Sequence, residues 1–507
     1  MKTIPVVDIF AGAGGLGEGF ASFSLGRRAD PVFQVMASAE MDSHAVRTLR
    51  TRAFFRQFPR GYAPSSYYRY AAGETAQPWT AVTEPQWDAA GQEALQIRLG
   101  DPDDDAVLHR RIRRIATQAR KDGCPWVLVG GPPCQAFSLI GRARNRGKKD
   151  YVPEEDGRHF LYQHYLTILA KFRPTVFVLE NVKGMLSAKV GGQSIFHEMF
   201  EQLQRPGGRH GPRYRIQPVV QSAEHLGDWD ARDFVVRAEA LGLPQARHRV
   251  ILLGVLEEAH ATIRPLQPIH ERYSVSDVIG GLPAVRSAPT DTDVRSWPRF
   301  SERLLRSCAS YTRSLDRRVS QHLYDLAEQA GSGNELDTGD RWMAADLKCQ
   351  MPAHLNDFIH DRRLKGVLNH QGRPHMSSDL MRYGFAAAFT AVNGRSPRGC
   401  DEFPVELHPL HRSWFQNNRF VDRFKVQRND APSSTITSHL AKDGHYYIHP
   451  DPLQLRSLTV REAARLQTFP DNFIFEGPAV SQRRQVGNAV PPWLGHQIAG
   501  VVHEALT

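Results

Sequence analysis

The chain contains no long hydrophobic run, few cysteines and no repeated or low-complexity segment. No stretch approaches the ~20 apolar residues that cross a membrane, and the start, MKTIPVVDIF, lacks the apolar region and cleavage site of a signal peptide. The five cysteines form no C-x-x-C pair, which argues against a zinc site and fits a reducing compartment. We therefore expect a cytoplasmic protein that holds no metal and contacts no membrane, and we interpret Cys400, His408 and His411 as ordinary surface residues.

Length and charge indicate the class of partner. The 507 residues suffice for two or three domains, and 41% hydrophobic and 23% charged residues are typical of a globular protein. The formal net charge of +10 and the isoelectric point of about 9.4 favour a polyanion such as nucleic acid.

Short apolar runs that alternate with helical patterns predict an α/β fold. Runs rich in β-branched residues and separated by helices are typical of a doubly wound, mostly parallel sheet. The segment FLYQHYLTILAKF places Leu161, Tyr165 and Ile168 on one helical face, which predicts a helix before one of these strands. The expected strands cover residues 4–10, 33–40, 126–131, 175–182 and 249–255.

We expect three parts along the chain. Residues 1–262 carry the strand–helix alternation and include an insert at 51–96 that shows no clear sheet pattern. Residues 263–430 are rich in Arg, Pro, Gly and Ser and are expected to form a second, smaller domain. In residues 431–507 the compact pattern returns to the first domain, with a helix that Thr459 caps.

A glycine-rich segment, DIFAGAGGLGEGF at 8–20, follows the first expected strand and satisfies G-x-G-x-x-G through Gly12, Gly14 and Gly17. A tight glycine turn at this place lets an adenosine-bearing cofactor approach the backbone. Glu40 ends the next strand, where an acidic side chain can accept hydrogen bonds from ribose hydroxyls. The glycines alone fit a nicotinamide cofactor as well as another adenosine-bearing group.

A second loop, GGPPCQAFSLIG at 130–141, places a thiol where open α/β sheets bind ligands. Pro132 and Pro133 stiffen the backbone directly before Cys134. An isolated cysteine is usually a buried structural residue, and we interpret Cys124 in that way. The neighbours of Cys134 are not core residues, so Cys134 is a candidate nucleophile.

These two loops and six further segments resemble, in the same order, the sequence blocks of DNA cytosine-5 methyltransferases. The resemblance covers about 1–260 and 431–507. It implies a Rossmann-like class I methyltransferase fold, S-adenosylmethionine as cofactor and methyl transfer to carbon 5 of a cytosine. The six further segments are SAEMD (38–42), GD (100–101), VLENVKGM (178–185), PQARHRVILLG (244–254), RSLTVREAARLQTFPD (456–471) and QVGNAVPP (485–492).

The resemblance implies a cofactor pocket built mainly from the first three blocks. In it Phe10 packs on the cofactor, Met41 lines the adenine side and Asp101 meets the adenine amino group. The expected cofactor-binding residues are Phe10, Ala11, Gly12, Gly14, Gly15, Leu16, Glu40, Met41, Asp101, Pro133, Leu161 and Asn488.

The resemblance also assigns the chemistry to four residues. Carbon 5 of cytosine is a poor nucleophile, and addition of the Cys134 thiolate at carbon 6 turns carbon 5 into an enamine-like carbon that can attack a sulfonium methyl. Glu180 can donate a proton or hydrogen bond near ring nitrogen 3. Arg247 and Arg249 are expected to alternate on a strand, so that one orients the base or the carboxylate while the other faces phosphate.

Contacts to DNA are expected around the reacting base and in residues 263–430. The target base is stacked inside the duplex and must flip out. The segment after Cys134, SLIGRARNRGKKDY, is basic and is expected to hold phosphates through Gln135, Ser138, Arg142, Arg144 and Arg146. The resemblance assigns reading of the target sequence to residues 263–430, which carry Arg303, Arg306, Arg313, Arg317 and Arg318 and a helical core face of Leu380, Tyr383 and Ala387.

The expected partner is double-stranded DNA, bound by a monomer in the cytoplasm beside the nucleoid. The enzyme would belong to a restriction-modification system, with a cognate restriction endonuclease, or would act as a solitary modification enzyme. An RNA cytosine methyltransferase is disfavoured by the long insert, because that branch of the family is compact. A non-catalytic DNA-binding relative is disfavoured by the intact catalytic set. A nicotinamide dehydrogenase is the weakest alternative, because nothing else in the chain serves hydride transfer.

Overall fold

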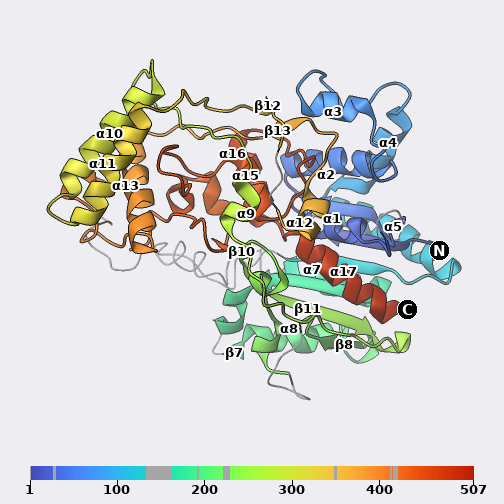
Figure 1. Cartoon of the computed structure of the whole chain (residues 1–507). Helices are drawn as coiled ribbons and strands as arrows, with labels where there is room; N and C mark the ends of the chain where they lie inside the picture. Colours follow the sequence, from blue (N-terminus) through green and yellow to red (C-terminus); the bar gives the residue numbers. More distant parts are fainter. Residues whose placement is uncertain are drawn as a thin grey trace.

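A central, mostly parallel β-sheet organises the chain (Figure 1). The computed structural model describes residues 2–26, 30–132, 161–190, 193–220, 229–347, 351–410, 414 and 421–507. In these residues the sheet has the strand order β3-β2-β1-β4-β5-β11-β8, with β9 beside β11. The strands are β1 (Ile4–Ile9), β2 (Phe33–Glu40), β3 (Ala94–Gln96), β4 (Val127–Gly130), β5 (Val176–Val182), β8 (Tyr214–Gln217), β9 (Val235–Arg237) and β11 (His248–Leu256).

Strand direction differs between the two halves of this sheet. β1 pairs in parallel with β2 and β4, and the parallel set continues to β3 and β5. β11 instead runs antiparallel to β5, β8 and β9. The chain moves outward from β1 to β2 on one side and from β4 to β5 on the other, so the strand order reverses at β1. Open α/β sheets bind ligands at such a reversal, and the expected doubly wound, mostly parallel fold is confirmed.

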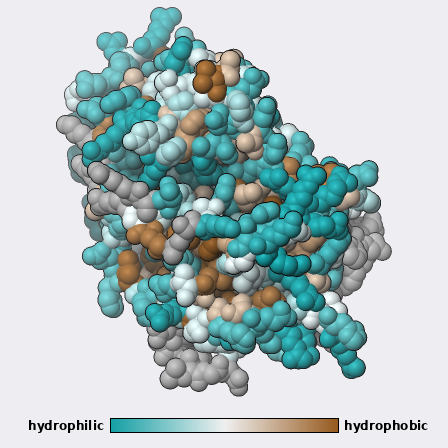
Figure 2. Space-filling model, turned by 90° about the vertical axis from the view of Figure 1, so that its right-hand side faces the viewer, coloured by the Kyte–Doolittle hydropathy of each residue, from teal (hydrophilic) through white to brown (hydrophobic). Residues whose placement is uncertain are grey.

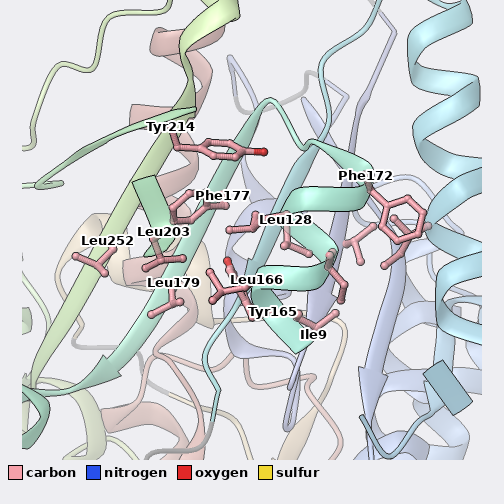
Figure 3. Packing of buried hydrophobic residues seen from close by; sticks show 14 of the residues in the cluster. Ile9, Leu128, Tyr165, Leu166, Phe172, Phe177, Leu179, Leu203, Tyr214 and Leu252 are labelled. Carbon is pink, nitrogen blue, oxygen red and sulfur yellow. The ribbon is translucent and has the colours of Figure 1, made fainter. Parts of the chain in front are cut away.

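Alternate side chains of the strands pack into two separate hydrophobic layers. Val7 and Ile9 of β1 belong to one layer, part of which is drawn in Figure 3, whereas Ile4 and Val6 belong to the other. Helices therefore cover both faces of the sheet. The first layer contains α5 (Pro102–Lys121), α7 (Leu161–Phe172) and α8 (Ile195–Gln204), and the second contains α1 (Gly15–Ser22) and α17 (Pro492–Leu506).

Helices α1 and α17 touch at small residues. A Cβ atom built on Gly19 would lie 2.5 Å from the backbone of Gly495, so a larger side chain would separate the two helices. A Cβ atom built on Gly15 would lie 2.0 Å from the carbonyl oxygen of Val490. The start of α1 is therefore built against residues from the far end of the sequence.

A group of three helices forms a hydrophobic cluster of its own, at the end of the molecule opposite both termini (Figure 1). Leu380, Tyr383 and Ala387 are buried in it, as the helical pattern predicts. The cluster also contains Ile448 and Leu455, so residues before and after position 430 contribute to it. The domain boundary at residue 430 stays a prediction. The helices are α10 (Trp297–Thr312), α11 (Arg317–Gly331) and α13 (Ser377–Asn393).

The segment 51–96 is joined to the first domain more closely than its sequence suggests. Its first residues continue α2 (Ser43–Arg56), and its last three residues form β3, which pairs with β2. The sequence shows no sheet pattern at β3, because Ala-Leu-Gln has no β-branched or aromatic residue. Between them lie α3 (Ser65–Ala71) and α4 (Glu84–Glu93).

Shorter elements connect these parts. The predicted cap of Thr459 is confirmed, because its hydroxyl accepts the N–H of Glu462 while that carboxylate accepts the N–H of Thr459. The short helices are α9 (Val275–Ile279), α12 (Ala353–Ile359), α15 (Val460–Leu466) and α16 (Ala479–Asn488). The short strand pairs are β6 (Lys189–Val190) with β7 (Gln193–Ser194), β10 (Gln245–Ala246) with β14 (Ser433–Ser434), and β12 (Trp342–Ala344) with β13 (Gly366–Leu368).

The surface is mainly polar on the face drawn in Figure 2. Its hydrophobic residues gather mainly at the lower left of that view. Within the described part of the chain, no helix combines the length and apolar character that a membrane crossing requires.

Candidate active site

The glycines of the loop between β1 and α1 have different structural roles. Gly12 has a φ of +56°, and a Cβ atom built on it would meet no other atom within 4 Å. This left-handed backbone therefore faces open space, as a loop that receives a ligand requires. Gly17 instead leaves room for the buried carboxylate of Asp8, whose Oδ2 accepts the Gly17 N–H at 3.2 Å. Burial raises the pKa of Asp8 to about 7. Asp8 was not among the residues expected from the sequence. The feature that could have identified it is a carboxylate inside an apolar run.

Glu40 connects the end of β2 to the glycine loop. Its Oε2 accepts the N–H of Gly12 at 2.9 Å, and its Oε1 accepts the N–H groups of Met41 and Asp42, each at 2.9 Å. The carboxylate thus fixes the loop at the reversal of strand order. Oε1 already accepts two hydrogen bonds and Oε2 one, so Oε2 can accept a further hydrogen bond from a ribose hydroxyl.

A hollow of about 260 Å³ adjoins the end of β2. It is lined by Met41, Gln96, Arg98, Asp101 and Asp104. Met41 is 57% exposed, although a large apolar side chain usually avoids water, and it is free to pack against a flat ring. Asp101 caps α5 through Oδ1, which accepts the N–H groups of the second and third residues after it. These residues fit an adenosine-bearing group.

A second hollow, of about 290 Å³, lies between α5 and α7 and is lined by Pro102, Asp105, Ala106, His109, Arg110, Arg113 and Lys171. It is slightly larger but contains none of the expected cofactor residues. The smaller hollow adjoins Glu40 and the open backbone of Gly12, so of the two it is the better placed to receive an adenosine-bearing group.

The other expected cofactor residues lie around the same loop. Phe10 and Leu161 are partly buried and pack against one hydrophobic layer of the sheet. Ala11 donates its N–H to the carbonyl of Ala39 at 3.1 Å, whereas Leu16 is buried in the opposite layer. Asn488 is exposed at the end of α16, two residues before the Val490 carbonyl that touches Gly15. Gly14 caps α1 with a φ of +82°, and Pro133 lies outside the described residues.

A carboxylate–guanidinium pair lies across the neighbouring strands β5 and β11. The Nε of Arg249 donates to Oε1 of Glu180 at 2.8 Å, and the two side chains are only 13% and 16% exposed. Arg249 also donates from Nη1 to the carbonyl of His248 at 2.8 Å. The guanidinium is therefore held in place and in turn fixes the orientation of the Glu180 carboxylate.

Arg247 is almost fully buried, with 2% of its surface exposed. Its Nη1 donates to the carbonyl of Ile436 at 2.6 Å, while its Nε has no hydrogen-bond partner. Burial and the nearby Arg249 hold the pKa of Arg247 well below its usual range. The arrangement differs from the expectation that one of the two arginines faces phosphate. Arg247 lies between β10 and β11 rather than within a strand, so the two side chains do not alternate as in a continuous strand.

The segment that leads from β4 toward Cys134 begins against Glu180. A Cβ atom built on Gly131 would lie 2.5 Å from the carbonyl oxygen of Glu180 and 2.9 Å from its Oε2. Asn181, which is buried, donates from Nδ2 to the carbonyl of Pro132 at 3.4 Å. Residues Cys134, Gln135, Ser138, Arg142, Arg144 and Arg146 lie outside the described residues.

The arrangement brings two sets of groups to one edge of the sheet. β1, β2, β4 and β5 run in the same direction, so the glycine loop, Glu40, Gly131 and Glu180 lie at or near the carboxyl ends of neighbouring strands. One set can hold an adenosine-bearing group. The other can bind a planar polar ring through a fixed carboxylate, beside the segment that carries a candidate nucleophile.

Comparison with known proteins gives relatives that span the chain. Residues 106–504 match the family model described as C-5 cytosine-specific DNA methylase. The chain is 31% identical over 522 residues to the type II methyltransferase M.Bpa9945I of Bacillus paralicheniformis, with 99% of both chains covered. It is 27% identical to the type II methyltransferase M.AgeI of Thalassovita gelatinovora, with 100% of both covered.

Two further comparisons concern a more distant relative and the fold. The chain is 26% identical to the DNA (cytosine-5-)-methyltransferase M.ApeKI of Aeropyrum pernix, over 75% of this chain and 81% of that protein. A crystal structure described as a prophage-encoded DNA modification methyltransferase (E. coli) covers 99% of both chains, with a TM-score of 0.54 at 19% identity. This last likeness supports the fold.

Proposed function

The chain belongs to the C-5 cytosine-specific DNA methylase family, and we propose that it methylates carbon 5 of a cytosine in a specific duplex DNA sequence through a covalent bond from Cys134. Methyltransferases of this family and fold use S-adenosylmethionine as the methyl donor. Two relatives carry the name type II methyltransferase, which supports a modification enzyme of the restriction-modification type.

The observation that carries the proposed mechanism is the Glu180–Arg249 pair beside Gly131. Arg249 engages Oε1 of Glu180 at 2.8 Å, which leaves Oε2 on the side of Gly131, the start of the segment that leads to Cys134. A base bound between this oxygen and Cys134 would present ring nitrogen 3 and the 4-amino group to Glu180. Glu180 then relieves the negative charge that builds on the ring while the thiolate adds.

The covalent cycle restores the Cys134 thiolate and consumes one methyl donor. The Cys134 thiolate forms a carbon–sulfur bond at carbon 6, and the electron pair of the 5,6 double bond makes carbon 5 nucleophilic. Carbon 5 then takes the sulfonium methyl group, and the electron pair of the broken carbon–sulfur bond stays on the sulfur of the donor. A base, such as a water molecule, removes the proton from carbon 5. The 5,6 double bond re-forms, and the carbon–sulfur bond breaks to release the thiolate.

The cofactor residues are proposed from the fit described above. When bound, S-adenosylmethionine supplies an electrophilic sulfonium methyl group. Oε2 of Glu40 would accept a hydrogen bond from a ribose hydroxyl, Met41 and Asp101 would contact the adenine, and the open backbone at Gly12 would face the rest of the molecule. Phe10, Leu161 and Asn488 would complete the pocket.

The proposal also includes contacts between the enzyme and DNA. Gln135, Ser138, Arg142, Arg144 and Arg146 would hold phosphates beside the flipped base, and residues 263–430 would read the target sequence. We expect a monomer to suffice, acting in the cytoplasm beside the DNA that it modifies. Exchange of residues 263–430 with those of a relative would then change the methylated sequence but not the chemistry.

The experiment uses duplex DNA whose target cytosine carries fluorine at carbon 5. Thiolate addition and methyl transfer still occur, but release fails because fluorine does not leave as a cation. The wild-type enzyme should form a denaturant-resistant complex only with S-adenosylmethionine, and the adduct should map to Cys134. Cys134→Ala should form none, and Glu180→Gln should form it much more slowly.

The matched control is Cys124→Ala, because Cys124 precedes β4, at the end away from Cys134, and its thiol donates to the carbonyl of Thr3 at 3.8 Å. This variant should trap DNA at the wild-type rate. An adduct in Cys134→Ala, or an adduct that maps to another cysteine, would overturn the assignment of the nucleophile.

A further inference from the structure

Arg483, on α16, is a buried arginine whose Nε lacks an acceptor. The residue is 7% exposed, and within the described part of the chain this Nε has no hydrogen-bond partner. Among the described residues, no carboxylate forms an ion pair with it. Burial and the neighbouring Arg373 lower its pKa to about 10. A guanidinium in this state is costly unless a ligand supplies the missing acceptor.

Arg373 lies beside Arg483, and little negative charge compensates its guanidinium. Arg373 is half-buried and donates from Nη1 to the carbonyl of Leu440 at 3.1 Å. The carboxylate that acts on Arg373 is Asp443, whose side chain is 48% exposed and lies 3.6 Å from the guanidinium of Arg423. Arg373 therefore shares this carboxylate with a third arginine. Lys442 adds a further positive charge to the same segment.

Residues 436–440, which we call the bridging segment, connect this arginine pair to the Glu180 site. At one end the carbonyl of Ile436 accepts from Arg247, and at the other the carbonyl of Leu440 accepts from Arg373. Four residues of chain span at most about 14 Å. Gly487 of α16 packs against the middle of the segment, where a Cβ atom would lie 2.3 Å from the backbone of Thr437.

The location suits a DNA backbone rather than a small substrate. Figure 1 draws α16 between the cluster of α10, α11 and α13 and the helices α1 and α2. Each DNA strand carries a charge about every 3.4 Å along the helix axis. A duplex whose cytosine lies at Glu180 must therefore bring phosphates within the length of the bridging segment.

We propose that Arg373 and Arg483 together bind one backbone phosphate of the DNA strand whose cytosine occupies the Glu180 site. This inference rests on the proposed function. The planar guanidinium groups match a phosphodiester, which can accept two parallel N–H bonds from each arginine. The phosphate supplies the acceptor that the fold leaves out, and it places the strand relative to Glu180.

The test measures binding to a duplex that the wild-type enzyme methylates. Affinities of wild type, Arg483→Met, Arg373→Met and the matched control Arg120→Met are measured by fluorescence anisotropy over a series of salt concentrations. Arg120 is exposed on α5, away from the bridging segment. Loss of one phosphate contact should reduce the slope of log affinity against log salt by about 0.9 and weaken binding roughly tenfold. Arg120→Met should change neither.

A second measurement separates a binding role from a structural one. Without DNA, Arg483→Met should unfold at the wild-type temperature or above it, because it removes an unpaired buried charge. Arg483→Lys should keep most of the salt slope. Inorganic phosphate should raise the unfolding temperature of wild type more than that of Arg483→Met.

Three results would overturn the phosphate site: unchanged salt slopes in both variants, a loss of stability in Arg483→Met that matches its loss of affinity, or a phosphate effect on unfolding without any effect on DNA binding. If wild type methylates cytosine in DNA and the slopes do not change, only this inference fails. If wild type does not methylate DNA at all, the proposed function itself fails.

Discussion

Two kinds of buried arginine divide the interior of this protein. Arg456 donates from Nη1 to Oε2 of Glu462 at 2.6 Å, and Arg465 donates from Nε to Oδ1 of Asp471 at 2.8 Å. These arginines have a carboxylate of their own and serve the fold. Arg483 is also buried, at 7% exposed, but has no such carboxylate among the described residues. The comparison teaches that burial alone does not make a charge structural, because the missing partner marks where a ligand is expected.

The same contrast occurs among the acids of the glycine loop. Although burial raises it, the pKa of Glu18 is lowered to about 2 by Arg52 and Arg56. Asp8, on the preceding strand, has one hydrogen-bond donor among the described residues, the N–H of Gly17, and burial raises its pKa to about 7. Paired and unpaired charges thus lie within one short motif, and the following predictions test each kind.

The largest effect is expected where a buried pair is broken. Arg456→Met leaves Glu462 buried without its guanidinium and should lower the free energy of unfolding by about 3–5 kcal/mol. Urea unfolding followed by tryptophan fluorescence measures this. A loss below about 1 kcal/mol would mean that the pair is not structural.

A smaller effect, dependent on pH, is expected for the unpaired acid. The native pKa of Asp8, about 7, exceeds that of the unfolded chain, so the native state binds the extra proton and loses stability as pH rises through 7. Between pH 5 and 8 wild type should lose about 3 kcal/mol more than Asp8→Asn. Histidine titration affects both proteins alike, so the difference in unfolding free energy isolates Asp8. Parallel pH profiles for the two proteins would contradict this origin.

The pair at the proposed site should affect activity more than stability. Arg249→Met should reduce kcat/KM for methylation roughly 100-fold, because Glu180 loses its fixed orientation. Arg249→Lys should recover part of the activity, and Arg249→Met should lose less stability than Arg456→Met, because the side chains of its pair are 13% and 16% exposed. Equal losses of stability and activity would assign Arg249 to the fold instead.

The smallest effect is expected at an exposed pair. Arg428 donates to Asp430 at 2.7 Å, but their side chains are 43% and 71% exposed. Arg428→Met should change the free energy of unfolding by less than about 1 kcal/mol. It is therefore the control for Arg456→Met under the same urea titration, and a loss comparable to that of the buried pair would remove the distinction between them.

Much of the fold could be predicted because local patterns specify it. The runs at β1, β2, β4 and β5 are apolar on both faces, as buried parallel strands require. Glu40 falls at a strand end, and Thr459 caps its helix through the predicted hydroxyl. The direction of β11 could not be predicted, because an apolar run reads the same whichever way it pairs.

The charged residues of the site could be identified from the sequence, but the sequence does not show which of them are buried. Arg483 and Arg484 are adjacent and look alike in sequence, yet the first is buried and the second is exposed. Which of the two arginines is buried depends on contacts with segments that are distant in the sequence, such as the bridging segment. The same limit applies to Arg247, whose acceptor Ile436 is far away along the chain.

The contact between Gly15 and the carbonyl of Val490 has a consequence for biosynthesis. A ribosome adds the glycine-rich segment 8–20 long before it adds residue 490, against which that segment packs. Until then the nascent chain carries the glycines without the surface that shapes them. We expect the proposed methyl-donor site to form only late in translation, because segments far apart in the sequence must meet to build it.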